Sequence, residues 1–251
     1  MSDGFEASMA EIHGAHLRYE VRGSGEPLLL LHGMGGCGGD WEHAGRDLLA
    51  KEYQLIIPDA RGHGRSTNPG GGFRHSQLAM DALALLDHLG VPRCKAIGMS
   101  MGGNTLLHLA TEAPDRVSAM VLVSATMSFP EQARAIMRQV VIEAPPPAEW
   151  ERMRKIHVHG DEQILAIWQA QRDLGDSHDD MAFAMDDLSH IQARTLIVYG
   201  DRDPLYPVEM AVHMYRGIHG AALWVIPGGG HGPIFTTAAP LFAKTALDFL
   251  R

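Results

Sequence analysis

Short runs of apolar residues recur along the chain and alternate with amphipathic stretches. The runs are continuous, as expected for strands of a parallel sheet that are covered on both faces. They lie at residues 28–31, 54–58, 95–99, 119–125, 195–200 and 223–228. Residues 76–90, 208–220 and 239–251 instead space their apolar side chains for one buried helix face. This alternation predicts an α/β fold with a mostly parallel central sheet flanked by helices.

Two segments depart from this rhythm. Residues 11–25 alternate polar and apolar positions around a turn at His13-Gly14, which predicts an antiparallel hairpin at the sheet edge. The about seventy residues between the runs at 119–125 and 195–200 contain no convincing buried strand, and an insertion of that length is typical of a lid or cap. We therefore divide the chain into a first core part (1–126), a helical cap (127–192) and a second core part (193–251).

Charge and cysteine content narrow the possible partners and compartments. A net charge of −9 argues against nucleic acid and anionic membranes, because both attract basic surfaces. Cys37 and Cys94 are too few for a disulfide framework or a paired Cys/His zinc site. Asp3 and Glu6 stand where a signal peptide would need basic and then apolar residues. We predict a cytoplasmic protein without a metal or a membrane contact, and leave open whether it forms a homodimer.

The segment Gly98-Met99-Ser100-Met101-Gly102 has the pattern G-x-S-x-G. In a chain with 28 glycines the bare pattern can arise by chance. Here a predicted strand enters the segment and a helical pattern leaves it, as a sharp turn that lifts a serine hydroxyl above a sheet requires. We therefore predict that Ser100 is a nucleophile.

A serine hydroxyl needs a neighbouring base to take its proton. Among 15 histidines, His231 stands out because it lies on a glycine-rich loop directly after the last predicted strand. Ligands gather at the carboxyl ends of strands in such sheets, where this loop and the Ser100 turn both lie. The imidazole in turn needs a carboxylate, and Asp203 follows the preceding strand. We assign Asp201 to backbone hydrogen bonds in the turn instead.

Two backbone amides are expected to bind the oxyanion that forms during attack. We assign Met101, at the start of the helix, and Met34, on the loop that follows His32-Gly33. We interpret His32 as bonding the loop backbone. Apolar side chains near the predicted mouth and in the cap suit a largely apolar substrate. The candidate substrate-binding residues are Gly33, Trp41, Met127, Phe129 and Trp168.

The chain resembles an α/β-hydrolase fold enzyme over essentially its full length. The landmarks are LLLLHGMGG, IIPDARGHGRS, GMSMGG, GDRDP and GGGHGP, in family order. The resemblance implies a Ser-His-Asp triad, a helical cap after the sixth strand and no cofactor. It also implies that Asp59, Arg61 and His63 belong to a structural loop rather than to the catalytic machinery.

The leading hypothesis is a serine carboxylesterase that cleaves small to medium, largely apolar esters through an acyl-enzyme. Lactone or enol-lactone hydrolysis, C–C bond hydrolysis of dienoic ketones, and a lyase resembling the menaquinone-pathway synthase stay open, because similar triads serve all of them. A small-molecule receptor that keeps the triad is a further alternative. Catalytic turnover would distinguish an enzyme from such a receptor.

Overall fold

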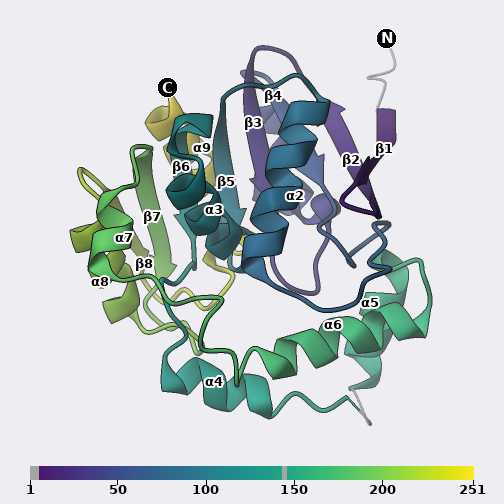
Figure 1. Ribbon diagram of the computed structural model, residues 1–251. Coiled ribbons are helices and arrows are strands. Elements are labelled where there is room, and N and C mark those ends of the chain that lie inside the picture. The colour runs from purple at the N-terminus through teal and green to yellow at the C-terminus, as the bar shows by residue number, and fades with distance from the viewer. Residues whose placement is uncertain (1–5, 143–145) are drawn as a thin grey trace.

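A computed structural model describes residues 6–142 and 146–251. Its centre is one eight-stranded sheet with the order β1-β2-β4-β3-β5-β6-β7-β8 (Figure 1). The strands are β1 Glu6–Ile12, β2 Ala15–Arg22, β3 Glu26–Leu31, β4 Tyr53–Pro58, β5 Cys94–Met99, β6 Val117–Val123, β7 Arg194–Gly200 and β8 Ala222–Ile226. Strands β3 to β8 pair in parallel, so the predicted mostly parallel sheet is confirmed.

The predicted edge hairpin is also present. Strands β1 and β2 pair antiparallel, with Ile12 opposite Ala15 across the turn. His13 and Gly14 both take positive φ angles there, 45° and 74°. Strand β2 in turn pairs antiparallel with β4, which joins the hairpin to the parallel part of the sheet.

Side chains of the continuous apolar runs alternate between two cores, because successive strand residues point to opposite faces. Leu29 and Leu31 of β3 lie in the core under α2 His75–His88, α3 Met101–Glu112 and α8 Val208–Gly217. Leu28 and Leu30 lie in the core on the other face, under the 3₁₀ helix η1 Gly38–Ala44, α1 Arg46–Leu49 and α9 Ala239–Leu250. Burial on both faces therefore explains why the run is uninterrupted.

Helices fill the long segment between β6 and β7. They are α4 Glu131–Arg138, α5 Pro147–Ile156, α6 Asp161–Asp173 and α7 Met185–Ser189. Helices α4 to α6 lie beyond the carboxyl ends of the parallel strands, whereas α7 packs against α8 (Figure 1). Met153 of α5 and Trp168 of α6 share a small separate core. Asp3, which the signal-peptide argument uses, lies outside the described residues.

None of the helices in the described part of the chain is long and apolar enough to span a bilayer.

Candidate active site

Ser100 occupies a strained turn between β5 and α3. Its φ and ψ angles are 50° and −112°, a region that residues with a side chain rarely adopt. Its N–H donates to the carbonyl of Val123 at 2.8 Å, and its carbonyl accepts the N–H of Asn104 at 2.8 Å. Neighbouring strand and helix therefore hold the turn from both sides, and the serine is only 8% exposed.

Two glycines allow the backbone to turn this sharply. A Cβ atom at Gly98 would collide with the main chain of Gly102, and one at Gly102 would collide with the main chain of Leu31. Because these obstacles are backbone atoms of packed elements, they cannot move aside as a flexible side chain would. The G-x-S-x-G spacing thus has a steric cause in this chain.

The structure brings Ser100, His231 and Asp203 into one hydrogen-bonded relay. The distance from His231 Nε2 to Ser100 Oγ is 2.8 Å, and His231 Nδ1 lies 2.8 Å from Asp203 Oδ2. The Asp203 carboxylate is fully buried, whereas the His231 side chain is 21% exposed. Residues 131 positions apart in sequence thus meet at the carboxyl ends of the strands.

The second oxygen of Asp203 anchors the relay to the backbone. Oδ1 accepts the N–H groups of Leu205 at 2.8 Å and Tyr206 at 3.1 Å. The carboxylate therefore has a defined orientation, with Oδ2 left for His231. Asp201, as predicted, accepts a backbone N–H, that of Gly228 at 2.5 Å.

The two amides assigned to the oxyanion border the same space. Met34 and Met101 both line the cavity that contains Ser100. Within the described part of the chain, the backbone hydrogen bonds of turns and loops use neither of their N–H groups. The Met34 loop is held from outside, because His157 Nε2 and Arg152 Nη2 each lie 3.3 Å from the carbonyl oxygen of Gly35.

A cavity of about 120 Å³ opens on Ser100 and His231. Of the predicted substrate-binding residues, Gly33 and Phe129 line it. Most of its wall is apolar, and among the described residues that line it there is no lysine or arginine. The lining is Gly33, Met34, His75, Met99, Ser100, Met101, Asn104, Phe129, Met137, Gln171, Leu174, Leu205, Tyr206 and His231.

The other three predicted substrate-binding residues lie outside this lining. Trp41 is 1% exposed and packs in the core beneath η1, α1 and α9. Met127 is buried in the core on the other face of the sheet. Trp168 packs in the small core between α5 and α6, with its ring centroid 5.2 Å from that of Trp150. Each of these apolar side chains belongs to a segment expected near the cavity. The side chain itself is buried in a core and does not face the cavity.

Four polar residues of the lining escaped the sequence reasoning: His75, Asn104, Gln171 and Tyr206. Asn104 lies one turn after Ser100, and its Oδ1 accepts the N–H of Thr126 at 2.9 Å. Tyr206 stands edge-on to His231, with 5.2 Å between ring centroids. Burial raises the pKa of Tyr206, so its hydroxyl stays protonated. His75 begins α2. The only signal for Asn104 and Tyr206 was nearness in sequence to Ser100 and Asp203, and His75 had none.

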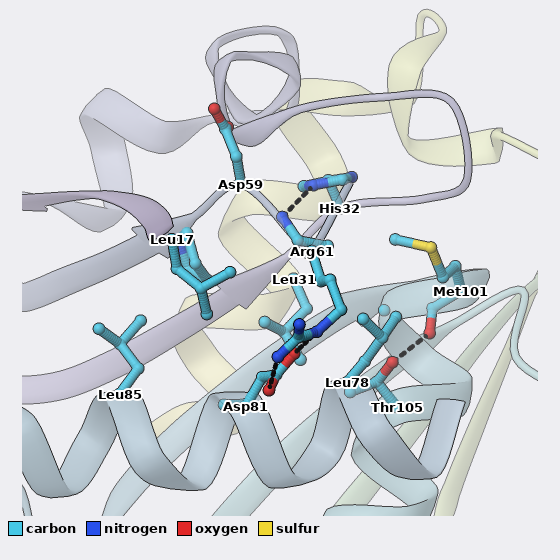
Figure 2. Close-up of a pocket in the computed structure, with 14 residues that line it drawn as sticks. Leu17, Leu31, His32, Asp59, Arg61, Leu78, Asp81, Leu85, Met101 and Thr105 are labelled. Atoms are coloured by element: carbon cyan, nitrogen blue, oxygen red, sulfur yellow. Dashed lines mark hydrogen bonds and ion pairs between the residues drawn. The ribbon is translucent and has the colours of Figure 1, made fainter. Parts of the chain in front are cut away.

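A second, smaller cavity of about 30 Å³ lies between the ends of β3 and β4 and helix α2 (Figure 2). Arg61 forms a two-pronged ion pair with Asp81 beside it, with both distances 2.7 Å. His32 bonds backbone at both ring nitrogens: Nδ1 lies 2.8 Å from Gly33 O, and Nε2 accepts the Ala60 N–H at 2.9 Å. These contacts fit the predicted scaffold roles of Arg61 and His32, and the remaining space is a packing void among leucines.

His63 is a buried histidine that must stay neutral. Its Nδ1 lies 3.1 Å from the carbonyl oxygen of Arg61, and its buried Nε2 has no hydrogen-bond partner among the described residues. Burial, with a contribution from His32, lowers the pKa of His63 to about 3. Protonation would place an unpaired N–H and a charge in the interior. The described residues bring together no group of three His, Cys, Asp or Glu side chains suited to a metal ion.

We expect His63 to make the fold sensitive to acid. In the unfolded chain a histidine binds its proton near pH 6.5, so below that pH the unfolded state takes up a proton that the folded state refuses. The contribution of His63 to the free energy of unfolding is fully present above pH 6.5 and is lost progressively as the pH decreases toward 3. For His63 the loss between pH 7 and pH 5 is about 2 kcal/mol of unfolding free energy. Urea unfolding at both pH values measures it.

The matched variants are His63→Gln and, as a control, His16→Gln on the exposed part of β2. His63→Gln should flatten the dependence of unfolding free energy on pH by that amount, whatever its stability at pH 7. His16→Gln should keep the wild-type slope. Equal slopes in all three proteins would contradict the assignment.

Comparisons with known proteins agree with this architecture. Residues 26–144 match the model of the alpha/beta hydrolase fold family. A protein from Variovorax paradoxus that bears the name of the carbamate hydrolase RutD is 31% identical over 93% of this chain and 96% of its own. A 2-hydroxy-6-oxo-6-phenylhexa-2,4-dienoate hydrolase from Comamonas testosteroni is 27% identical over 94% of this chain and 91% of its own. The structure of a thermophilic esterase from Thermogutta terrifontis superposes with a TM-score of 0.78 at 23% identity, covering 98% of both chains.

Both full-length sequence similarity and structural similarity support the assignment to a family. The Variovorax relative is aligned over nearly its whole length, and the eight-stranded, mostly parallel sheet is the fold that the resemblance implies. The chain belongs to the α/β-hydrolase fold family.

Proposed function

We propose that this hydrolase cleaves carboxylic esters with a small, uncharged acyl group through Ser100, His231 and Asp203. The observation that carries the proposal is the continuous relay from Asp203 through His231 to the Ser100 hydroxyl, which opens on a mostly apolar cavity. A serine activated by a histidine, with a carboxylate that orients the histidine, is the arrangement that acyl transfer needs.

The proposed reaction has two halves. Ser100 Oγ attacks the ester carbonyl carbon while His231 Nε2 takes the hydroxyl proton, and the carbonyl oxygen becomes an oxyanion held by the Met34 and Met101 amides. When the C–O bond of the ester breaks, His231 returns the proton to the departing alcohol. Water then attacks the acyl-enzyme with His231 again as base, which releases the carboxylic acid and restores Ser100.

The proposed cap is the group of helices between β6 and β7. Met137 of α4, together with Gln171 of α6 and Leu174 just after it, supplies part of the cavity wall opposite Ser100. The division at residues 127–192 thus places part of the substrate-binding wall in the insertion and the nucleophilic chemistry in the core. Helix α7 packs against α8 of the core and takes no part in the wall.

A carboxylate-bearing substrate suits this cavity less well. The Comamonas relative is named for a dienoate, and a carboxylate in a mostly apolar cavity needs a cationic partner. Among the described lining residues no lysine or arginine is present to provide one. This favours an uncharged ester, and among the alternatives an uncharged lactone, over C–C cleavage of a dienoate.

We expect the enzyme to prefer short acyl chains. An engineered protein cavity of about 150 Å³ holds one benzene molecule, so the space of about 120 Å³ beside Ser100 accommodates a slightly smaller group. The value of kcat/KM for p-nitrophenyl esters should therefore fall by roughly tenfold or more from butyrate to decanoate, since each excess methylene finds no cavity to fill. Steady-state release of nitrophenol measures the series.

Two methionine variants sharpen this test. Met137→Ala enlarges the cavity and should move the optimum toward longer chains. Met127→Ala removes a buried methionine outside the lining and should leave the optimum in place. Decanoate hydrolysed faster than butyrate by the wild type would contradict a small acyl group. A single stoichiometric burst of nitrophenol without turnover would favour a receptor, and faster hydrolysis of lactones would favour the lactonase alternative.

A further inference from the structure

A second histidine faces the cavity with one ring nitrogen tied to a buried aspartate. His75 is the first residue of α2 and lines the cavity that contains Ser100. Its Nδ1 lies 2.7 Å from Asp180 Oδ2, and both side chains are 2% exposed. The arrangement repeats that of His231 and Asp203, where the corresponding distance is 2.8 Å. The reaction proposed above leaves this pair unused.

The surroundings of Asp180 determine where the His75 proton lies. Its carboxylate also accepts the backbone N–H of His75 at 2.8 Å and that of Ser76 at 3.3 Å. Burial acts to raise the pKa of Asp180, but the hydrogen bonds from His75 and Ser76 outweigh it and lower the pKa to about 2. An ionised carboxylate only accepts hydrogen bonds, so Nδ1 of His75 carries the proton.

The other ring nitrogen of His75 is left with a lone pair. Burial lowers the pKa of His75, which keeps the ring neutral, and a neutral imidazole with its proton on Nδ1 is an acceptor at Nε2. Within the described part of the chain Nε2 has no hydrogen-bond partner. Nε2 is not sealed away from solvent, and because His75 lines the cavity, we place Nε2 at the cavity wall.

The bond to Asp180 accounts for Nδ1 of His75 but not for Nε2. Asp180 already caps α2 through the two backbone amides, and the ring packs between Phe73 and Phe129 at centroid distances of 5.1 Å and 5.9 Å. An apolar ring would keep these ring contacts and lose only the Nδ1 hydrogen bond to Asp180, so neither the packing nor the helix cap requires a nitrogen at the Nε2 position. A polar nitrogen on an apolar wall is costly unless a ligand satisfies it.

We propose that His75 is a specificity-determining residue whose Nε2 accepts a hydrogen bond from a hydroxyl on the substrate, so that the preferred acyl group is a short hydroxyacyl chain. This inference rests on the proposed esterase function and names its substrate class. The small cavity places the hydroxyl within a few atoms of the scissile carbonyl. Asp180 acts through His75, by holding the ring and its tautomer.

Paired esters that differ only by a hydroxyl or a methyl group test the proposal. The pairs are ethyl lactate with ethyl isobutyrate, and ethyl 3-hydroxybutyrate with ethyl 3-methylbutyrate, followed by acid release in a pH-stat. For at least one pair the wild type should prefer the hydroxyl ester by roughly tenfold or more in kcat/KM, because the methyl ester leaves Nε2 unpaired.

Two phenylalanine variants separate recognition from packing. His75→Phe keeps the aromatic contacts and should abolish or invert the preference by losing activity on the hydroxyl ester. His108→Phe is the matched control, because His108 Nε2 also bonds Asp180, at the backbone oxygen at 2.7 Å, but does not line the cavity. It should keep the wild-type ratio. A loss of preference in both variants, or in neither, would overturn the assignment.

A binding measurement keeps this inference separate from catalysis. In the Ser100→Ala variant labelled with ¹⁵N-histidine, 3-hydroxybutyramide or lactamide should shift the Nε2 resonance of His75, and the methyl-bearing amides should not. Equal hydrolysis of both esters in each pair, without such a shift, would refute the role of His75 and leave the esterase proposal standing. A shift of the His75 resonance without any ester hydrolysis would support hydroxyl recognition by His75 and refute the esterase proposal. A wild type that prefers monoethyl malonate would show His75 to be a cation and refute the proposal.

Discussion

Replacement of Ser100 by alanine is expected to reduce kcat on p-nitrophenyl butyrate by about 10⁵-fold, because water must then attack the ester without a covalent intermediate. The fold should survive. Alanine has the same backbone preferences as serine at φ 50°, and the hydrogen bonds of this turn to Val123 and Asn104 are made by main-chain atoms. The midpoint temperature of thermal unfolding, Tm, should therefore change by only a few degrees.

Ser124 provides the matched control. It too has a positive φ, 45°, is fully buried, and follows the neighbouring strand β6, but its hydroxyl has no hydrogen-bond partner among the described residues. Ser124→Ala removes the same atom from the same kind of backbone and should keep wild-type turnover. Substantial activity in Ser100→Ala would mean that another group attacks the ester, and labelling by a fluorophosphonate would then fall on that group.

Asp203→Asn is expected to lower kcat by about 10³- to 10⁴-fold with little change in KM. The amides of Leu205 and Tyr206 both donate to Oδ1, so the new side chain will keep its oxygen there and turn its NH₂ group toward His231. A donor at that position forces Nδ1 of His231 to be the acceptor, and the ring proton moves to Nε2. His231 then points an N–H at Ser100 and cannot take the hydroxyl proton.

The neighbouring carboxylate tests whether this effect is specific. Asp201 accepts one backbone N–H, from Gly228, and an asparagine oxygen can replace it. Asp201→Asn should therefore retain activity within a few-fold. Similar losses in both variants would point to a general disturbance of the loop after β7, and retention of activity in Asp203→Asn would remove Asp203 from the relay.

Local patterns in the sequence predict much of this molecule. Continuous apolar runs mark strands buried on both faces, and glycines before and after Ser100 mark a turn that tolerates no Cβ atom. Ser100, Asp203 and His231 each lie within three residues of the end of a predicted strand. Because parallel strands end at one edge of the sheet, their convergence follows from the order of elements.

Only the tertiary structure decided where individual side chains point and which residues they contact. Trp41 and Trp168 are near the mouth in sequence, yet the packing of their helices turns both into separate cores. His75 enters the cavity because α2 begins beside it and because Asp180, 105 residues later, holds its ring. Sequence spacing specifies the local backbone, whereas a cavity wall depends on which distant segments fold against each other.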